Sequence, residues 1–89
     1  MPKLILTAHL IRHAGGTEFD VPGSTVRELL EGLFAQRPLL RGYVLDDQGA
    51  LRHNVVAFVN GTVVHDKENL ADPVPPDGEV YLLQALSGG

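Results

Sequence analysis

One amphipathic helix is the feature that most restricts how this chain folds. Apolar residues recur at helical spacing and form a single stripe, made of Val26, Leu29, Leu30, Leu33 and Phe34. Thr25 and Glu28 have the spacing of a capping box at the start of the helix, and Pro38 ends it near Arg37. Burying the stripe would stabilise the fold by about 7–15 kcal/mol before entropy is counted. The helix must therefore supply much of the core.

The rest of the chain has the character of short strands. The expected strands are residues 4–12, 17–21, 43–45, 50–52, 55–59, 62–64 and 79–84. Residues 55–59 are continuously apolar, which predicts an interior strand covered on both faces. Asn60-Gly61 predicts a two-residue hairpin, and Asp46-Asp47-Gln48-Gly49 predicts a turn. No stretch after Arg37 has helical periodicity, so we expect no second helix.

The order of these elements predicts an α+β fold. Two strands precede the helix, several short strands follow it, and a last strand ends at residue 84. This order is typical of the ubiquitin-like β-grasp, in which a mixed β-sheet wraps around one main helix and the last strand pairs with the first in parallel. We expect one domain over residues 1–84, followed by a flexible C-terminal tail over residues 85–89.

Composition excludes several classes of function. The formal net charge of −4 argues against binding to nucleic acid or to an anionic membrane. The chain contains no cysteine, which excludes disulfides, cysteine-based zinc sites, iron–sulfur clusters and thiol nucleophiles. The N-terminus lacks the features of a signal peptide, and no apolar run approaches about 18 residues. We therefore expect a cytoplasmic protein without a membrane segment.

The histidines do not predict a metal site. His9 and His13 are four residues apart, but on a strand that leads into a turn and not on one face of a helix. His53 and His65 lie in a strand approach and in a loop, and no cysteine or tight carboxylate cluster accompanies them. We expect solvated or structural roles for these side chains, with no metal and no cofactor bound by the chain itself.

The last residues, Ala85-Leu86-Ser87-Gly88-Gly89, offer a reactive group of another kind. Glycine has no Cβ, so Gly88 and Gly89 can enter a slot too narrow for other residues. Ordering them costs entropy, so a terminus that served stability alone would rarely end in this way. Two interpretations stay open from these residues: a frayed end, or a carboxylate that is presented to another enzyme for chemistry.

Several motifs occur in a fixed order along the chain. They are Val21-Pro22-Gly23-Ser24-Thr25-Val26-Arg27-Glu28-Leu29-Leu30, Val59-Asn60-Gly61, Pro76-Asp77-Gly78-Glu79-Val80 and the terminal Gly88-Gly89. In this order and at this spacing they resemble the MoaD/ThiS family of small sulfur-carrier proteins, over essentially the whole chain. The segment Leu45-Asp46-Asp47-Gln48-Gly49-Ala50-Leu51-Arg52 is similar to the longer branch of that family, which includes the carrier used in cysteine biosynthesis.

The resemblance implies that the chain is a carrier and not an enzyme. In this family a ubiquitin-activating-type adenylyltransferase uses ATP and magnesium to adenylate the terminal carboxylate, here that of Gly89. A sulfur donor then converts the acyl-adenylate to a thiocarboxylate, and a synthase accepts the sulfur for molybdopterin, thiazole, cysteine or tRNA thiolation. The chain itself has no phosphate-binding loop ending in Lys-Ser or Lys-Thr, and no catalytic constellation of its own.

The resemblance also implies a partner-binding surface. The patch that faces the partner in this family corresponds here to Leu83, Val63 and Thr7. The tail that the activating enzyme grips corresponds to Leu86, Ser87, Gly88 and Gly89. If Val80 and Leu82 pack on the helix, then Tyr81 and Leu83 point away from it, which adds Tyr81 to the patch. The alternative is that Tyr81 and Leu83 are simply a half-covered sheet surface.

Two other functions stay open. A ubiquitin-like protein modifier would be joined through Gly89 to lysines of target proteins, because an activated glycyl carbonyl accepts an amine as well as a sulfide. A non-covalent adaptor would bind a partner through its β-grasp surface and leave the tail unused. We expect the free chain to be a monomer.

Overall fold

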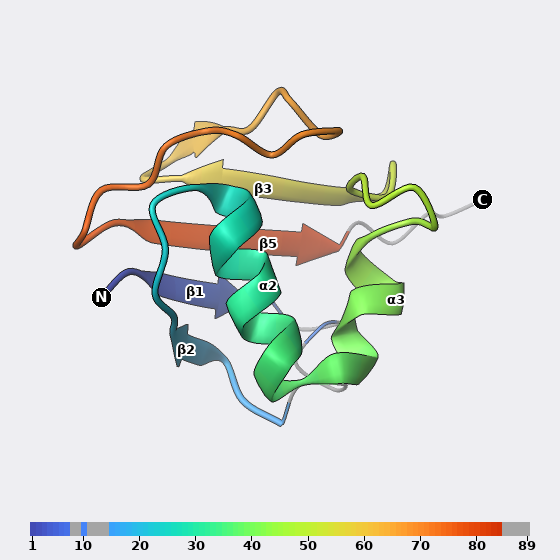
Figure 1. The fold of residues 1–89 in the computed structure, drawn as a ribbon, viewed down its shortest axis with the longest axis horizontal. Coiled ribbons are helices and arrows are strands. Elements are labelled where there is room, and N and C mark those ends of the chain that lie inside the picture. The colour runs from blue at the N-terminus through green and yellow to red at the C-terminus, as the bar shows by residue number, and fades with distance from the viewer. Residues whose placement is uncertain (8–9, 11–14, 85–89) are drawn as a thin grey trace.

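The computed structural model describes residues 1–7, 10 and 15–84 of the chain (Figure 1). Its strands are β1 (Lys3–Leu6), β2 (Glu18–Asp20), β3 (Val55–Val59), β4 (Thr62–Val63) and β5 (Glu79–Gln84). Its helices are α2 (Val26–Gln36), the 3₁₀ helix η1 (Pro38–Leu40) and the short helix α3 (Arg41–Val44). The long connection from β1 to β5 therefore carries every one of these helices.

The strands form one mixed sheet in the order β2-β1-β5-β3-β4. β1 and β5 are parallel, with Lys3 opposite Glu79 and Leu6 opposite Leu82, and the other pairs are antiparallel. The first and last strands thus lie side by side inside the sheet, as Figure 1 shows. This arrangement confirms the predicted ubiquitin-like β-grasp. The last strand pairs with the first in parallel, and the long crossover connection that a parallel pair needs contains helix α2.

Helix α2 begins and ends where the sequence predicts. Thr25 Oγ1 accepts a hydrogen bond from the Glu28 amide at 3.2 Å, and Glu28 Oε1 accepts one from the Ser24 amide at 2.8 Å. At the other end the Arg37 amide donates to the Leu33 carbonyl at 2.8 Å. The whole predicted apolar stripe is buried: Val26, Leu29, Leu30, Leu33 and Phe34.

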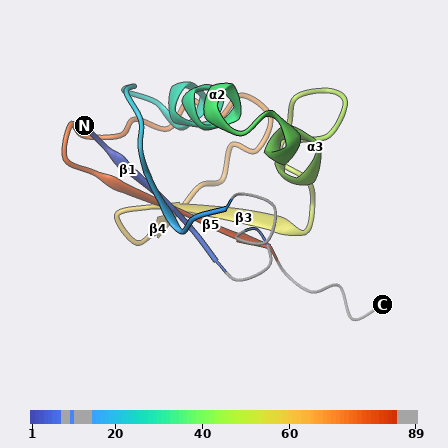
Figure 2. The ribbon, with the colours of Figure 1, turned by 90° about the horizontal axis from the view of Figure 1, so that it is seen from below.

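One face of the sheet is packed beneath the helices. Figure 2 shows α2 and α3 on the same side of the sheet. The buried strand residues that join the core on this side are Leu4, Leu6, Phe19, Val55, Ala57, Val80 and Leu82. Burial of apolar surface contributes about 25 cal/mol per Å², so packing of this face against the α2 stripe within one core cluster stabilises the fold.

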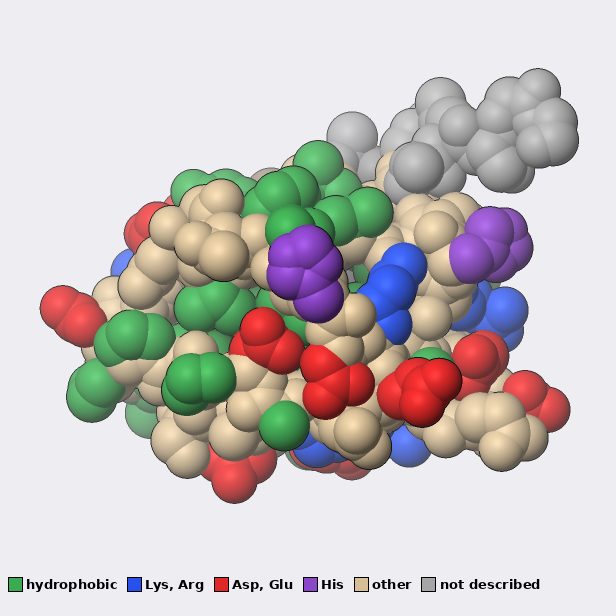
Figure 3. Space-filling view, turned by 90° about the horizontal axis from the view of Figure 1, so that it is seen from above, with side chains coloured by type: hydrophobic (Ala, Val, Ile, Leu, Met, Phe, Trp, Pro, Cys, Tyr) green, Lys and Arg blue, Asp and Glu red, His purple; other side chains and the backbone are tan. Residues whose placement is uncertain are grey.

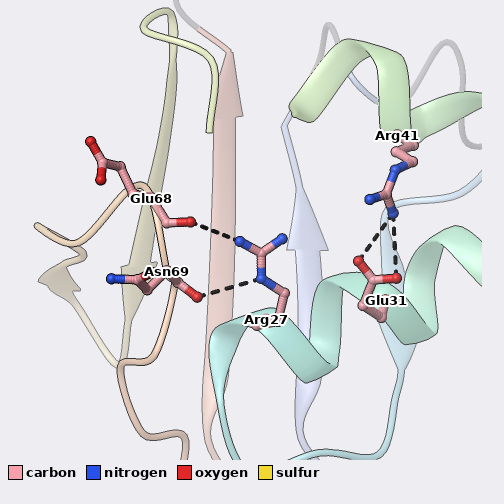
Figure 4. Close-up of polar contacts among 5 residues, drawn as sticks. All are labelled: Arg27, Glu31, Arg41, Glu68 and Asn69. Atoms are coloured by element: carbon pink, nitrogen blue, oxygen red, sulfur yellow. Dashed lines mark hydrogen bonds and ion pairs between the residues drawn. The ribbon is translucent and has the colours of Figure 1, made fainter. Parts of the chain in front are cut away.

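Arg27 fastens the start of α2 to the loop at residues 66–70 (Figure 4). Its Nη2 donates to the Glu68 carbonyl at 2.8 Å, and its Nε donates to the Asn69 carbonyl at 3.4 Å. The Arg27 amide donates to the Leu70 carbonyl at 2.9 Å. Leu70 is fully buried and has a φ of 56°, which is uncommon for leucine, so burial and these contacts hold the loop in place.

Two predicted turns are confirmed. Asn60 and Gly61 have φ values of 48° and 85° and join β3 to β4, as a two-residue hairpin requires. Asp46 Oδ1 accepts hydrogen bonds from the amides of Gln48 at 2.8 Å and Ala50 at 3.1 Å. The strands expected around this second turn are reduced to a single bridge between Leu45 and Leu51.

The first strand is shorter than the sequence predicts. β1 ends at Leu6 and not at Arg12, and the Leu10 amide donates to the Thr7 carbonyl at 3.0 Å. This hydrogen bond between residues three apart is not that of an extended strand, and Leu10 is fully buried in the core. Residues 8–9 and 11–14 lie outside the described part of the chain.

The prediction of a strand at residues 43–45, and of no helix after Arg37, is wrong. η1 and α3 form a continuous helical segment directly after α2. Leu40 and Val44 are four residues apart and both fully buried, so helical spacing places both in the core. This packing outweighs the strand preference of Tyr43 and Val44. The segment is also too short for a helical period to be recognised in the sequence.

Strand β3 has the predicted bounds, but only one of its faces is covered. Val55 and Ala57 are fully buried, whereas Val56 and Phe58 are partly exposed. The prediction of cover on both faces is therefore wrong, because the helices pack on one side of the sheet (Figure 2). Within the described residues, no helix is both long enough and apolar enough to span a membrane.

Candidate functional site

The side of the sheet turned away from α2 carries a band of apolar side chains and one threonine, which we call the sheet face. Its members are Ile5, Thr7, Val56, Phe58, Val63, Tyr81 and Leu83. Strand pairing places Ile5 opposite Tyr81, Tyr81 opposite Phe58, and Phe58 opposite Val63. These four residues form a row across β1, β5, β3 and β4, because directly paired residues point to the same side of a sheet.

A second row lies nearer the end of β5. Val56 is paired with Leu83. The Thr7 amide donates to the Leu82 carbonyl at 3.2 Å, which places Thr7 next to Leu83. Gln84, the last described residue, follows Leu83 directly. The second row therefore borders the point from which residues 85–89 continue.

Tyr81 and Leu83 are the most exposed members of the sheet face, at 38% and 37%. The other members are half-buried. In Figure 3 hydrophobic side chains gather along the upper margin of the view, which is the sheet side, while Asp and Glu side chains gather toward the helix side. Neighbouring apolar side chains that stay at least partly exposed, as these do, are characteristic of protein-binding surfaces.

Charged side chains lie at the other end of the sheet face. Lys3 Nζ donates to Asp20 Oδ1 at 3.2 Å and lies 4.0 Å from Glu18 Oε2. The hydrogen bond to Asp20 and the negative charges of Asp20, Glu18 and Glu79 raise the pKa of Lys3 above its ordinary value. Because Lys3 is paired with Glu79 at the start of β5, the sheet face is charged at one end and apolar where the tail begins.

The structure brings together the residues predicted for partner binding. Tyr81 and Val63 are both paired with Phe58, and Thr7 lies beside Leu83. Their role in binding a partner stays a prediction. The predicted tail residues Leu86, Ser87, Gly88 and Gly89 lie outside the described residues.

Sequence reasoning missed three members of the sheet face. Alternation along the expected strand at residues 4–12 puts Ile5 on the face opposite Leu4 and Leu6, so its signal is present in the sequence, but nothing there connects it with the patch. Val56 and Phe58 were missed because the run at residues 55–59 predicted a strand with no open face. Pairing with β5 is what identifies them.

Metal-binding geometry is not present in the part of the chain that the structure describes. No group of three or more histidine, cysteine or carboxylate side chains converges there. His53 and His65 are exposed, and His9 and His13 lie outside the described residues. The arrangement that the described residues do provide is a docking surface next to the root of the tail.

Comparison with known proteins gives matches over the whole chain. The sequence model of the ThiS family matches residues 4–89. SAMP1 from Haloferax volcanii is 28% identical to this chain in sequence, and its crystal structure matches with a TM-score of 0.81. The match covers 99% of this chain and 98% of that one. The small archaeal modifier protein 1 from Methanosarcina acetivorans is 26% identical with a TM-score of 0.84, covering 99% and 95%.

A third solved structure shares the fold at lower identity. A chain in the crystal structure of the Amycolatopsis orientalis BexX/CysO complex is 19% identical in sequence, with a TM-score of 0.87. The match covers 100% of this chain and 100% of that chain. No curated protein sequence matches the chain. The family and the fold thus agree with the β-grasp architecture described above.

Proposed function

Because the chain belongs to the ThiS family of ubiquitin-like carrier and modifier proteins, we propose that it is a sulfur carrier. In this proposal a partner enzyme adenylates the carboxylate of Gly89, and a sulfur donor converts the adenylate to a thiocarboxylate. The thiocarboxylate then donates its sulfur in a biosynthetic pathway. The chain is a protein substrate of its partners and supplies no catalytic side chain.

The observation that carries the proposal is the continuity between the sheet face and the tail. Tyr81 and Leu83 are exposed on β5, and that strand leads within a few residues to Gly88-Gly89. A partner that binds the sheet face is therefore positioned to take up the tail that follows. Glycines suit the narrow, water-excluding slot that protects an acyl-adenylate from hydrolysis.

The chemistry needs activation because a carboxylate is a poor electrophile. Attack by the carboxylate on ATP forms the acyl-adenylate and releases pyrophosphate. A sulfide equivalent then attacks the glycyl carbonyl, and AMP leaves as the thiocarboxylate forms. The chain has no cysteine, so the sulfur has no side-chain thiol on which to be carried.

The partners follow from this sequence of steps. An adenylyltransferase of the ubiquitin-activating type would hold ATP and magnesium, and this chain would bind neither by itself. A sulfur donor and a sulfur-accepting synthase would act next. CysO, a protein of the same fold, is found in complex with BexX, which supports a partner enzyme for this chain without identifying it.

Intact-mass measurement tests the proposal. The protein is incubated with an activating enzyme, ATP, magnesium and sulfide, and an oxygen-for-sulfur mass increase at the C-terminus is expected. The matched control is the Gly89 deletion, which should show no increase. Absence of the mass change in the full chain, together with normal pathway output from the deletion variant in cells, would overturn the proposal.

A second candidate function is conjugation to target proteins. It is favoured by solved structures of SAMP1, among them one that is 28% identical, because SAMP1 is named a small archaeal modifier protein. The activated Gly89 carbonyl would then accept a lysine amine and form an isopeptide bond. Immunoblots should show slower-migrating adducts that disappear in the Gly89 deletion variant, whereas a single free band would argue against conjugation.

A further inference from the structure

Both proposed functions pass through an activated Gly89 carbonyl, which forms a stable amide with any neutral amine that reaches it. The chain has no cysteine, and lysine occurs only at positions 3 and 67, whereas arginine occupies its other cationic positions. Arginine stays protonated in proteins and is therefore not an amine nucleophile. Lys3 and Lys67 are thus the side chains of this protein that an activated tail can acylate.

Lys3 is held by carboxylates. Its Nζ donates to Asp20 Oδ1 at 3.2 Å and lies 4.0 Å from Glu18 Oε2, and strand pairing places Glu79 directly opposite it. The hydrogen bond to Asp20 and the surrounding negative charges raise the pKa of Lys3, so the amine stays protonated and has no lone pair to attack a carbonyl. Lys3 also lies on the side of the sheet on which the activating enzyme is proposed to dock.

The surroundings of Lys67 are different. Among the residues that the structure describes, no carboxylate lies within ion-pair distance of its amine, and its side chain makes no hydrogen bond. Lys67 is half-buried as a whole residue. The stem of a lysine commonly lies along the protein surface while its amine stays in water. Lys67 therefore offers the amine that Lys3 withholds.

The backbone on which Lys67 stands is fixed by hydrogen bonds. The Lys67 amide donates to the His65 carbonyl at 3.0 Å, and the Lys67 carbonyl accepts the Leu51 amide at 2.9 Å. Within the same loop the Asn69 amide donates to Asp66 Oδ1 at 3.0 Å. An amine that is presented from a fixed backbone loses less freedom when it meets a carbonyl, which favours its attack.

The loop that carries Lys67 leaves the sheet and crosses to the helices. At the sheet the Val64 amide donates to the Ala57 carbonyl at 2.8 Å, and at the start of α2 the Arg27 amide donates to the Leu70 carbonyl at 2.9 Å. Figure 2 shows the chain rising after β4 from the sheet layer toward the helical layer. Lys67 is therefore not part of the sheet face. A copy that is acylated there keeps its sheet face and its own tail for a further activation.

We propose that Lys67 is an acylation site at which copies of this chain are joined to one another. The neutral amine of Lys67 in one copy attacks the adenylated Gly89 carbonyl of another copy. AMP leaves, the amine nitrogen loses one proton to water, and an isopeptide bond remains between the two chains. The inference rests on the proposed function only for the activation of Gly89, and it holds whether the usual acceptor is a sulfur donor or a target protein.

Intact mass after activation without sulfide tests this assignment. The full-length protein is incubated with an activating enzyme, ATP and magnesium, and pyrophosphate release shows that the adenylate forms. A covalent dimer with the mass of two chains less one water is expected. Lys67→Arg keeps the charge but removes the nucleophile, and should lower the dimer yield about 10-fold or more. Lys3→Arg is the matched control and should give the wild-type yield.

Peptide mapping and a second variant sharpen the test. Cleavage after glutamate should leave residues 80–89 of the donor attached to the acceptor peptide that contains Lys67. Asp20→Asn removes the hydrogen-bonded carboxylate of Lys3. Added to Lys67→Arg, it should raise the dimer yield several-fold, now through Lys3. Melting temperatures should be the same for wild type and Lys67→Arg, which separates a lost acceptor from a lost fold.

The outcomes distinguish the possible failures. If pyrophosphate is released but no dimer forms, or if Lys67→Arg forms the dimer as wild type does, the assignment of Lys67 is wrong while the activation of Gly89 stands. If no pyrophosphate is released, the proposed function and this inference fall together. A single chain lighter by one water would show that the tail acylates its own chain, and a bond mapped to the N-terminal amine would place the site elsewhere; either result overturns the proposal.

Discussion

The two sides of strand β5 differ completely in their surroundings. Val80 and Leu82 are 0% exposed and pack beneath the helices, whereas Tyr81 and Leu83 are 38% and 37% exposed on the sheet face. Adjacent residues of one strand thus belong to the core and to the candidate docking surface in turn. Substitutions of the inward-facing residues of β5 should therefore lower the stability of the fold, whereas substitutions of the outward-facing residues should weaken partner binding.

The largest expected effect is on the inner side. Leu82→Ala should lower the free energy of unfolding by about 2–5 kcal/mol, because it leaves a cavity in a fully packed core. Urea denaturation followed by circular dichroism measures this change. The control is Leu83→Ala on the same strand, which should cost under about 1 kcal/mol because the leucine is partly exposed. Equal decreases in the free energy of unfolding for the two variants would contradict the difference between the two sides of β5.

The next effect belongs to the outer side and is functional. Tyr81→Ala and Leu83→Ala should each weaken recognition by the activating enzyme by about 1–3 kcal/mol, or roughly 5- to 150-fold in kcat/KM for adenylation. Large side chains near the centre of an interface contribute most to binding. Pyrophosphate release measures the rate. Wild-type kinetics in both variants would show that the sheet face is only a half-covered surface.

A smaller effect concerns the helix that covers the inner side. Thr25→Ala removes the side-chain cap at the start of α2 and should lower stability by about 1 kcal/mol. Because the helix lies on the other side of the sheet, adenylation of the folded variant should be unchanged. Thermal unfolding gives the first quantity, and pyrophosphate release gives the second. A slower adenylation rate at a temperature where the variant is folded would contradict the separation of the two sides.

The smallest effect lies at the charged end of the sheet face. The pKa of Lys3 is raised above its ordinary value of 10.5 by the hydrogen bond to Asp20 and the nearby carboxylates. Its ion pairs therefore contribute stability that is fully present below the unfolded pKa and is lost as the pH rises through the folded pKa. Lys3→Met should abolish that alkaline loss.

Melting temperatures of wild type and Lys3→Met, measured at neutral pH and at pH values above 10.5, test this expectation. Lys3 is exposed, so the difference should be small. The wild-type curve should fall more steeply with pH than the curve of the variant. Parallel curves would show that the ion pairs make no net contribution to folding.

Much of the fold could be predicted because its signals are local. Helix α2 was bounded by a capping threonine, a stripe of constant period and a proline, and each of these acts within a few residues. The last strand was predicted at residues 79–84 and is found there, since it follows a proline-rich connection. The hairpin at Asn60-Gly61 has the backbone conformation that this pair of residues favours.

The wrong predictions concern segments whose secondary structure or burial depends on contacts with residues far away in the sequence. Tyr43 and Val44 have strand propensity, but Leu40 and Val44 share a buried side when the chain is helical. β1 ends at Leu6, and Leu10 is buried with its amide bonded to the Thr7 carbonyl instead of continuing the strand. The run at residues 55–59 gave no sign that α2 covers just one side of it.

The sequence by itself thus determined which segments are helix and strand where the period is long enough, and the family to which the chain belongs. Alternation along the last strand also placed Tyr81 and Leu83 on the side away from the helix. The tertiary structure alone decided that Val56 and Phe58 stay partly uncovered, because they are as apolar or aromatic as their buried neighbours and the run shows no alternation. Their exposure depends on the side of the sheet on which the helices pack, and that is set by contacts between residues far apart in the chain.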